Sequence, residues 1–99
     1  MKRTIMPELI IDREFKNLIP PLSRSEYLQL EENIIVEGCR EPIITWKGII
    51  VDGHNRYEIC TRHNIAFSIK EKDFDCREAA IAWICANQLG RRNVTEETR

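Results

Sequence analysis

Two short β-rich runs separated by a two-residue loop constrain the fold of this chain most. Residues 43–46 (IITW) and 49–51 (IIV) flank Lys47-Gly48. β-branched and aromatic side chains favour strands, and a two-residue loop with glycine in the second position is typical of an antiparallel hairpin. The sequence therefore predicts a hairpin near its centre, around which the other elements must be arranged.

The segments on either side of the hairpin predict an alternation of extended runs and helices. Ser23 and Glu26 fit a capping box, apolar residues then recur at helical spacing, and Gly38 ends the helix. The predicted elements are, in chain order, a strand at residues 9–11, a helix at 23–37, the hairpin, a helix from Gly53 to Asn64, a strand at 67–70 and a helix that Asp75 caps and Gly90 ends. Thr95-Glu96-Glu97 predicts the start of a further helix in residues 95–99, so we expect a domain at residues 1–94 of a longer protein.

The helical spacing also predicts which side chains are buried. The expected core residues are Tyr27, Leu28, Leu30, Ile34, Ile35, Trp46, Ile81, Trp83, Ile84, Cys85 and Leu89. We assign no ligand role to the aromatic residues among them, because aromatic side chains on apolar faces are usually core.

The net charge of the chain limits how it could bind nucleic acid. Fifteen Lys and Arg against sixteen Asp and Glu give a net charge of −1, which excludes nucleic-acid binding by bulk positive charge. Any anion site must therefore be local.

The four cysteines form no Cys-x-x-Cys motif, and their number allows two disulfides. Cys60 and Cys85 nevertheless lie among apolar helix positions, which favours reduced thiols in the core. No apolar run is long enough to span a membrane, so we expect a cytoplasmic protein without a membrane partner.

The turn at Gly53 is the best candidate for an anion site. The first amides of a helix have no intrahelical partner and carry the positive end of its dipole, and glycine lets a phosphate approach them closely. Arg56 follows one turn later and can bind an anion bidentately, while His54 and Asn55 add polar groups. The same pattern also fits a simpler interpretation, in which Asp52 caps the helix and Arg56 is a solvated surface charge.

Three segments resemble conserved boxes of the ParB/sulfiredoxin superfamily, in particular the ParB N-terminal-like domain, also described as the ParB-like nuclease domain. The segment Glu37-Gly38-Cys39-Arg40-Glu41-Pro42-Ile43-Ile44 is similar to the first box, with Glu41 in place of the usual Gln. Gly53-His54-Asn55-Arg56-Tyr57 is similar to the second box, and Asn87 through Thr95 to the third. The resemblance implies an α/β (α+β) fold with a small mixed sheet and flanking helices.

The resemblance also implies a nucleotide pocket. In ParB proteins these boxes bind CTP with Mg²⁺ and drive closure of a clamp on DNA, whose sequence a following domain reads. Carried over, Gly53 and Arg56 would hold phosphates. The implied phosphate- and nucleotide-binding residues are Gly53, His54, Asn55, Arg56, Arg40, Glu41, Asn87, Arg91 and Arg92.

The function that follows is a nucleotide- or phosphate-binding domain of a DNA-associated protein, in plasmid partition, replication or phage-type regulation, acting as a ligand-controlled switch. The expected partners are a nucleotide such as CTP with Mg²⁺, DNA through a further C-terminal domain, and a second copy of the chain. Sulfiredoxin activity is disfavoured, because His54 stands where that family has its nucleophilic cysteine.

Two alternatives remain open. The first is an enzyme using the same pocket as a nucleotide hydrolase, kinase or nuclease, for which Glu41 is the candidate general base. Asp52, His54 and His63 are considered as metal ligands, but their spacing does not support a metal site. The second alternative is an interaction domain whose pocket no longer binds a ligand.

Overall fold

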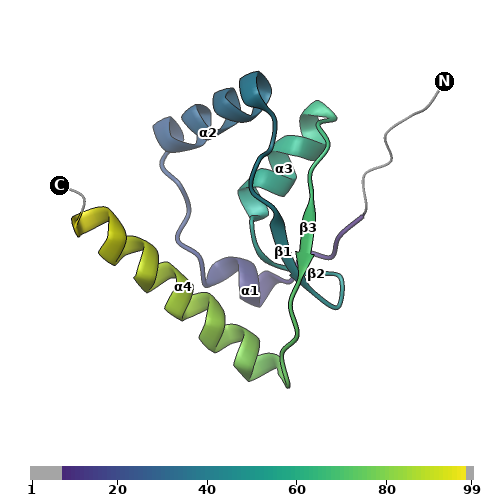
Figure 1. Ribbon diagram of the computed structural model, residues 1–99, viewed down its shortest axis with the longest axis vertical. Helices are drawn as coiled ribbons and strands as arrows, with labels where there is room; N and C mark the ends of the chain where they lie inside the picture. Colours follow the sequence, from purple (N-terminus) through teal and green to yellow (C-terminus); the bar gives the residue numbers. More distant parts are fainter. Residues whose placement is uncertain (1–7, 98–99) are drawn as a thin grey trace.

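The computed structural model describes residues 8–97 of the chain, and side chains as far as Gln88. Four helices accompany a three-stranded sheet within the described residues (Figure 1). The elements are α1 (Arg13–Asn17), α2 (Arg24–Glu37), β1 (Ile43–Trp46), β2 (Ile49–Asp52), α3 (His54–His63), β3 (Ile69–Glu71) and α4 (Arg77–Glu97). None of the described helices is long and apolar enough to cross a membrane.

The predicted hairpin is confirmed, and its first strand, β1, is the middle strand of the sheet. β1 pairs antiparallel with β2 and parallel with β3, so the strand order is β2-β1-β3 and the sheet is mixed, as expected. Lys47 and Gly48 have φ values of 53° and 78°, the left-handed conformations that a twisted two-residue hairpin loop requires. The strand predicted at residues 9–11 is reduced to a single parallel bridge between Ile10 and Ile49.

The helix beginning after Ser23 is confirmed with its capping box. The Ser23 hydroxyl accepts from the Glu26 amide at 3.2 Å, and the Glu26 carboxylate accepts from the Ser23 amide at 2.9 Å. The helix following Gly53 also ends as predicted, because Asn64 adopts a left-handed conformation with φ 59°. Local side-chain chemistry therefore defines the ends of α2 and α3.

The prediction for the last helix was wrong at both ends. α4 begins at Arg77, so that Cys76 rather than Asp75 immediately precedes it, and the amides of Ala79 and Ala80 donate to the Cys76 carbonyl. Its backbone continues through Gly90 to Glu97. A glycine inside a helix costs only about 1 kcal/mol relative to alanine, which neighbouring helix-forming residues offset. Residues 95–97 therefore extend α4 and do not begin a further helix.

Helix α1 was not predicted from the sequence. Asp12 caps it by accepting from the Phe15 amide at 3.1 Å, and Phe15 is fully buried. Arg77 joins α1 to α4, with Nη2 2.6 Å from Asp12 and Nε 2.9 Å from Glu14, while its guanidinium lies over the Phe15 ring. These contacts lie far apart in the chain, so a helix of five residues gains its stability from tertiary packing.

Two apolar clusters lie around the sheet. One joins α1 and α4 to the sheet and contains Phe15, Trp46, Val51, Ala80 and Ile84. The other joins α2 to α3 and contains Ile34, Ile59 and Cys60. In Figure 1, α2 and α3 accordingly lie at one end of the molecule, and α1 and α4 at the other. The two halves meet at the hairpin and at the segment leading into α3.

Several predicted core residues are not buried. Ile34, Trp46, Ile84 and Cys60 are buried as expected, but Leu28, Ile35 and Cys85 are exposed. Helical spacing places Leu28 and Ile35 on one stripe, yet the structure turns the stripe of Leu30 and Ile34 toward α3 instead. The sequence does not predict which of two adjacent apolar stripes a partner helix will cover. Leu89 lies outside the residues whose side chains are described.

Loss of the capping box should destabilise the fold measurably. Replacing Ser23 with Ala leaves the Glu26 amide without its side-chain acceptor, and we expect the free energy of unfolding to fall by about 1 kcal/mol. Urea denaturation followed by circular dichroism measures this loss. Ser68→Ala, at an exposed serine outside the helices, is the matched control. Equal stability of the two variants would contradict a structural role for the cap.

Candidate functional site

The site is built on the turn between β2 and α3. Gly53 has φ 103° and is buried, and it precedes the first helical residue, His54, without offering a side chain to cap the helix. The predicted alternative, in which Asp52 is the N-cap residue, is therefore wrong. The first amides of α3 begin at a glycine, and backbone donors near the positive end of the helix dipole suit an anion.

Arg56 folds back across Gly53. Its Nη2 donates to the Pro42 carbonyl at 2.9 Å and lies 3.9 Å from an Asp52 carboxylate oxygen, while its Nη1 lies 3.8 Å from a Glu41 carboxylate oxygen. Only 14% of the Arg56 side chain is exposed, so it is not a solvated surface charge. The guanidinium therefore joins the start of β1 to the end of β2 from the first turn of α3.

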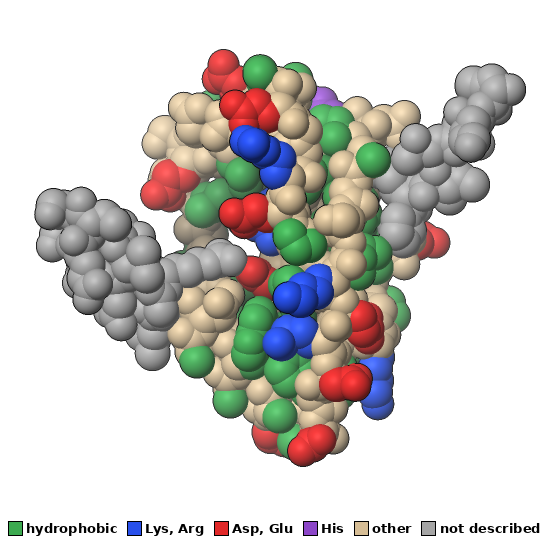
Figure 2. Space-filling model, viewed as in Figure 1, with side chains coloured by type: hydrophobic (Ala, Val, Ile, Leu, Met, Phe, Trp, Pro, Cys, Tyr) green, Lys and Arg blue, Asp and Glu red, His purple; other side chains and the backbone are tan. Residues whose placement is uncertain are grey.

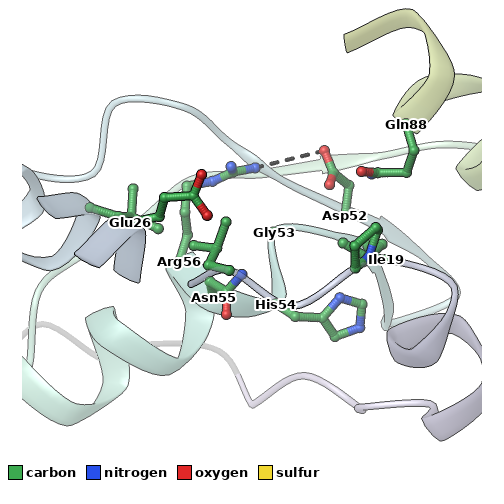
Figure 3. Close-up of a pocket in the computed structure, with 11 residues that line it drawn as sticks. Ile19, Glu26, Asp52, Gly53, His54, Asn55, Arg56 and Gln88 are labelled. Carbon is green, nitrogen blue, oxygen red and sulfur yellow. Dashed lines mark ion pairs between the residues drawn. The ribbon is translucent and has the colours of Figure 1, made fainter. Parts of the chain in front are cut away.

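A cavity of about 350 Å³ opens beside this turn (Figure 3). Its size lies within the range of small-ligand pockets, about 300 to 1,000 Å³. Four stretches of chain contribute to it: the segment between α1 and α2, the first turns of α2, the β2–α3 turn, and α4. The lining residues are Ile19, Pro20, Leu22, Glu26, Leu30, Asp52, Gly53, His54, Asn55, Arg56 and Gln88.

Three polar groups in the cavity lining have buried atoms without a hydrogen-bond partner. Both ring nitrogens of His54, Nε of Arg56 and Nε2 of Gln88 are buried and unpaired in the described structure. Figure 3 shows Gln88 reaching from α4 toward Asp52, which faces Arg56. A buried donor without an acceptor costs about 1 to 3 kcal/mol, which a ligand or water supplying acceptors would recover. The lining is thus chemically incomplete on its own.

The charge of the lining limits which ligands it can hold. Two carboxylates, Glu26 and Asp52, and one guanidinium, Arg56, line the cavity. Burial lowers the pKa of His54, and the nearby Lys16 ammonium acts in the same direction, so this imidazole is neutral at pH 7. The formal charge of the lining is therefore −1, and a polyphosphate would require a cation to offset the two carboxylates.

No metal site is formed by protein groups alone in the described part of the chain. It contains no cluster of three or more His, Cys, Asp or Glu side chains suited to a metal ion. His63, considered above with Asp52 and His54, lies at the other end of α3, where its Nε2 is 2.6 Å from a Glu31 carboxylate oxygen. Any Mg²⁺ here would take most of its ligands from water and from phosphate oxygens.

The structure brings together some of the sequence-predicted site residues and separates others. Gly53, His54, Asn55 and Arg56 line the main cavity, while Glu41 and Asn87 line a shallower adjoining pocket of about 210 Å³ that shares Asp52 and Arg56. Glu41, the candidate general base, is thus close to Arg56, as the kinase alternative requires.

Of the other predicted arginines, the structure describes the side chain of Arg40 alone, and Arg40 does not line the cavity. Arg40 lies on the surface, where its Nη1 is 3.1 Å from Glu37. Arg91 and Arg92 belong to α4 beyond Gln88, outside the residues whose side chains are described. On the face shown in Figure 2, acidic and basic side chains are interspersed, which agrees with a local anion site and not a broad basic surface.

Sequence reasoning missed several residues that line the cavity. Gln88 adjoins the predicted Asn87, and helical geometry alone decides which of the two neighbours faces the β2–α3 turn. Glu26 was identified as a capping residue, which it is, but it also lines the cavity. Ile19 and Pro20 lie between α1 and α2, in a segment to which the sequence assigned no helix or strand. None of these residues carries a local pattern that indicates a pocket.

Comparison of this chain with protein families, with curated proteins and with solved structures gives no significant match.

Gly53 should be the least replaceable glycine among those that the structure describes. A Cβ at Gly53 would lie 2.9 Å from Nη2 of Arg56 and 3.3 Å from Cγ1 of Ile43, in addition to the strain of its positive φ. A Cβ at Gly48, also at positive φ, would meet no atom within 4 Å. We expect Gly53→Ala to lower the free energy of unfolding by about 1 kcal/mol more than Gly48→Ala.

Urea denaturation of these two variants measures the difference. Gly48→Ala reports the cost of the left-handed conformation alone, and the excess in Gly53→Ala reports the displacement of Arg56 and Ile43. An equal loss in the free energy of unfolding for both variants would contradict the close packing of Arg56 over Gly53.

His54 should make stability depend on pH between about 5 and 7. Its pKa in the folded state is lowered from the usual 6.5, chiefly by burial and also by Lys16, although the carboxylates of Asp52 and Asp12 oppose the shift. The unfolded chain therefore binds a proton that the folded chain does not, and the free energy of unfolding falls as pH drops below about 6.5. His54→Gln should flatten this slope in denaturation experiments at pH 5, 6 and 7.

The matched control is His63→Gln, which removes the other histidine. It should leave intact the part of the slope that His54 contributes. A His54→Gln variant with an unchanged slope would show that the imidazole is not held neutral in the folded chain.

Proposed function

We propose that this chain is a nucleotide-binding domain of a DNA-associated protein, in which a nucleotide bound as its Mg²⁺ complex acts as a conformational switch. The observation that carries the proposal is the cavity at the β2–α3 turn. There the first turn of α3, without a side-chain cap from Gly53, and the guanidinium of Arg56 lie beside buried unpaired groups of His54 and Gln88.

The phosphates of the ligand would lie at the start of α3. The amides following Gly53 supply donors there, and a glycine is the residue that allows a phosphate to approach them closely. Arg56 already donates to the Pro42 carbonyl at 2.9 Å, but its Nε is unpaired and buried at the cavity. It can therefore contribute charge and a donor to a bound anion without being displaced.

The lining charge supports a nucleotide with Mg²⁺ over a free polyphosphate. Glu26 and Asp52 would repel a bare triphosphate, and a divalent cation bound to the phosphates offsets that repulsion. The apolar part of the lining, Ile19, Pro20, Leu22 and Leu30, offers a surface for the uncharged part of the ligand. CTP is the first candidate nucleotide because of the resemblance to ParB proteins, and other nucleotides are the next candidates.

A switch follows from the number of segments that meet at the cavity. A ligand in contact with Gln88 on α4, Glu26 on α2 and Asn55 on α3 stabilises one relative placement of the three helices. A ligand shifts a conformational equilibrium only by its different affinity for the two states. Contacts with helices of both apolar clusters provide such a difference, so a bound ligand would favour one placement of α4 relative to α2 and α3.

The second candidate function is an interaction domain without a small ligand. The observation that favours it is the exposed apolar surface of α2, where Leu28 and Ile35 are about half exposed and Val36 is 72% exposed. Apolar groups gathered on one helix are typical of contact with another protein. Under this alternative no nucleotide would stabilise the chain.

The test is a thermal-shift titration of the wild type and of Asn55→Asp with CTP, ATP, ADP and inorganic phosphate, each with and without Mg²⁺. An added carboxylate in the first turn of α3 favours the helix dipole, so the variant should melt at or above the wild-type temperature without ligand. The same carboxylate repels phosphate. We expect an approximately tenfold larger dissociation constant, which, at a ligand concentration about one hundred times the wild-type dissociation constant, lowers the stabilisation by the ligand to about half.

Asn33→Asp is the matched control, since it makes the same charge change on α2, where Asn33 is exposed and outside the cavity lining. It should keep the full nucleotide shift. If no nucleotide shifts the wild type, or if both variants shift equally, the proposed nucleotide site is wrong. Absence of any shift would favour the interaction domain.

A further inference from the structure

Cys39 and Cys60 come together at the junction of α2 and α3, and neither of them lines the cavity. Cys39 follows Gly38, the residue that ends α2, and Cys60 lies in the second half of α3. They are 21 positions apart in the chain, and the hairpin and the Gly53 turn lie between them. Both thiols are free.

The two side chains are in direct contact. Cys39 packs against the cluster of Ile34, Ile59 and Cys60, and its sulfur lies near enough to the Cys60 thiol to contribute to the raised pKa of Cys60. Cys39 is partly exposed and its own thiol donates to the Glu41 carbonyl at 3.6 Å, whereas Cys60 has no exposed surface. An oxidant from solvent can thus reach Cys39 directly, whereas Cys60 is shielded from it.

We propose that Cys39 and Cys60 form a reversible oxidation site, in which a peroxide oxidises Cys39 and Cys60 then closes an intramolecular disulfide. This site does not depend on nucleotide binding. Two cysteine side chains packed in one cluster can reach bonding distance by side-chain rotation, whereas most cysteine pairs lie too far apart to be bridged.

The chemistry takes two steps. The Cys39 thiolate attacks one oxygen of hydrogen peroxide, the O–O bond breaks, and Cys39 becomes a sulfenic acid with release of hydroxide. The Cys60 sulfur then attacks the Cys39 sulfur, the S–O bond breaks, and the leaving hydroxide takes the Cys60 proton as water. Two thiols are oxidised to one disulfide while one peroxide is reduced to water, and a dithiol reductant reverses the reaction.

The different environments of the two sulfurs determine their roles. Burial, together with the neighbouring Cys39 thiol, raises the pKa of Cys60 to about 12, so Cys60 stays protonated and does not react first with peroxide. It is suited to the second step, in which the reacting sulfur of Cys39 is its immediate neighbour. Without Cys60, the Cys39 sulfenic acid would be open to further oxidation.

The experiment uses the full chain with the exposed Cys76 and Cys85 both replaced by Ser, so that only the proposed pair remains. After treatment with hydrogen peroxide, the protein is unfolded, its free thiols are alkylated, and its intact mass and non-reduced peptides are measured. We expect loss of both alkylation sites in a monomeric chain, a peptide containing Cys39 joined to one containing Cys60, and recovery of both thiols with dithiothreitol.

Two further variants in this background assign the order of events. Cys60→Ala should leave Cys39 as sulfenic and then sulfinic acid without an intramolecular disulfide. Cys39→Ser, changed at the partly exposed position, should leave Cys60 fully alkylatable after peroxide treatment and unfolding. The proposal is overturned if the parent pair keeps an alkylatable Cys60 after peroxide, or if Cys60 is oxidised equally well when Cys39 is absent.

Discussion

The contact of Arg56 with the chain around Gly53 is the interaction on which the rest of the structure depends. The guanidinium donates to the Pro42 carbonyl at the start of β1 and lies beside Asp52 at the end of β2. One side chain from the first turn of α3 thereby holds the open ends of the hairpin together. Gly53 makes this possible, because a Cβ there would lie 2.9 Å from Nη2 of Arg56.

This arrangement gives the site two properties that would otherwise conflict. A buried arginine is normally costly unless it is paired, and here Asp52 and the Pro42 carbonyl compensate it. The compensation is incomplete, because Nε of Arg56 and both ring nitrogens of His54 remain buried and unpaired. A stable framework thus surrounds a cavity whose polar groups are not all satisfied, which is the condition for selective ligand binding.

The two halves of the molecule meet at the same place. Phe15, Trp46 and Ile84 anchor α1 and α4 on one side, while Ile34 and Ile59 anchor α2 and α3 on the other. The cavity has lining residues from both halves, including Gln88 and Glu26. Cys39 and Cys60 connect α2 to α3 within one half. Ligand binding would therefore act between the halves, and oxidation within one of them.

Local sequence was enough to predict the elements whose ends are set by neighbouring residues: the capping box at Ser23, the hairpin loop at Lys47-Gly48 and the left-handed end at Asn64. It also predicted the Gly53 turn and a local anion site there, because glycine followed by a helix is a local pattern. Features that depend on contacts between distant residues emerged only from the folded chain. Helix α1 forms because Phe15 is buried and Arg77 bonds to Asp12. The packing of α4 decides that Gln88, and not Asn87, lines the cavity at the β2–α3 turn. Arg56 lies against Pro42 because the hairpin brings the Pro42 carbonyl beside it. Such contacts join residues far apart in the chain, and no local spacing encodes them.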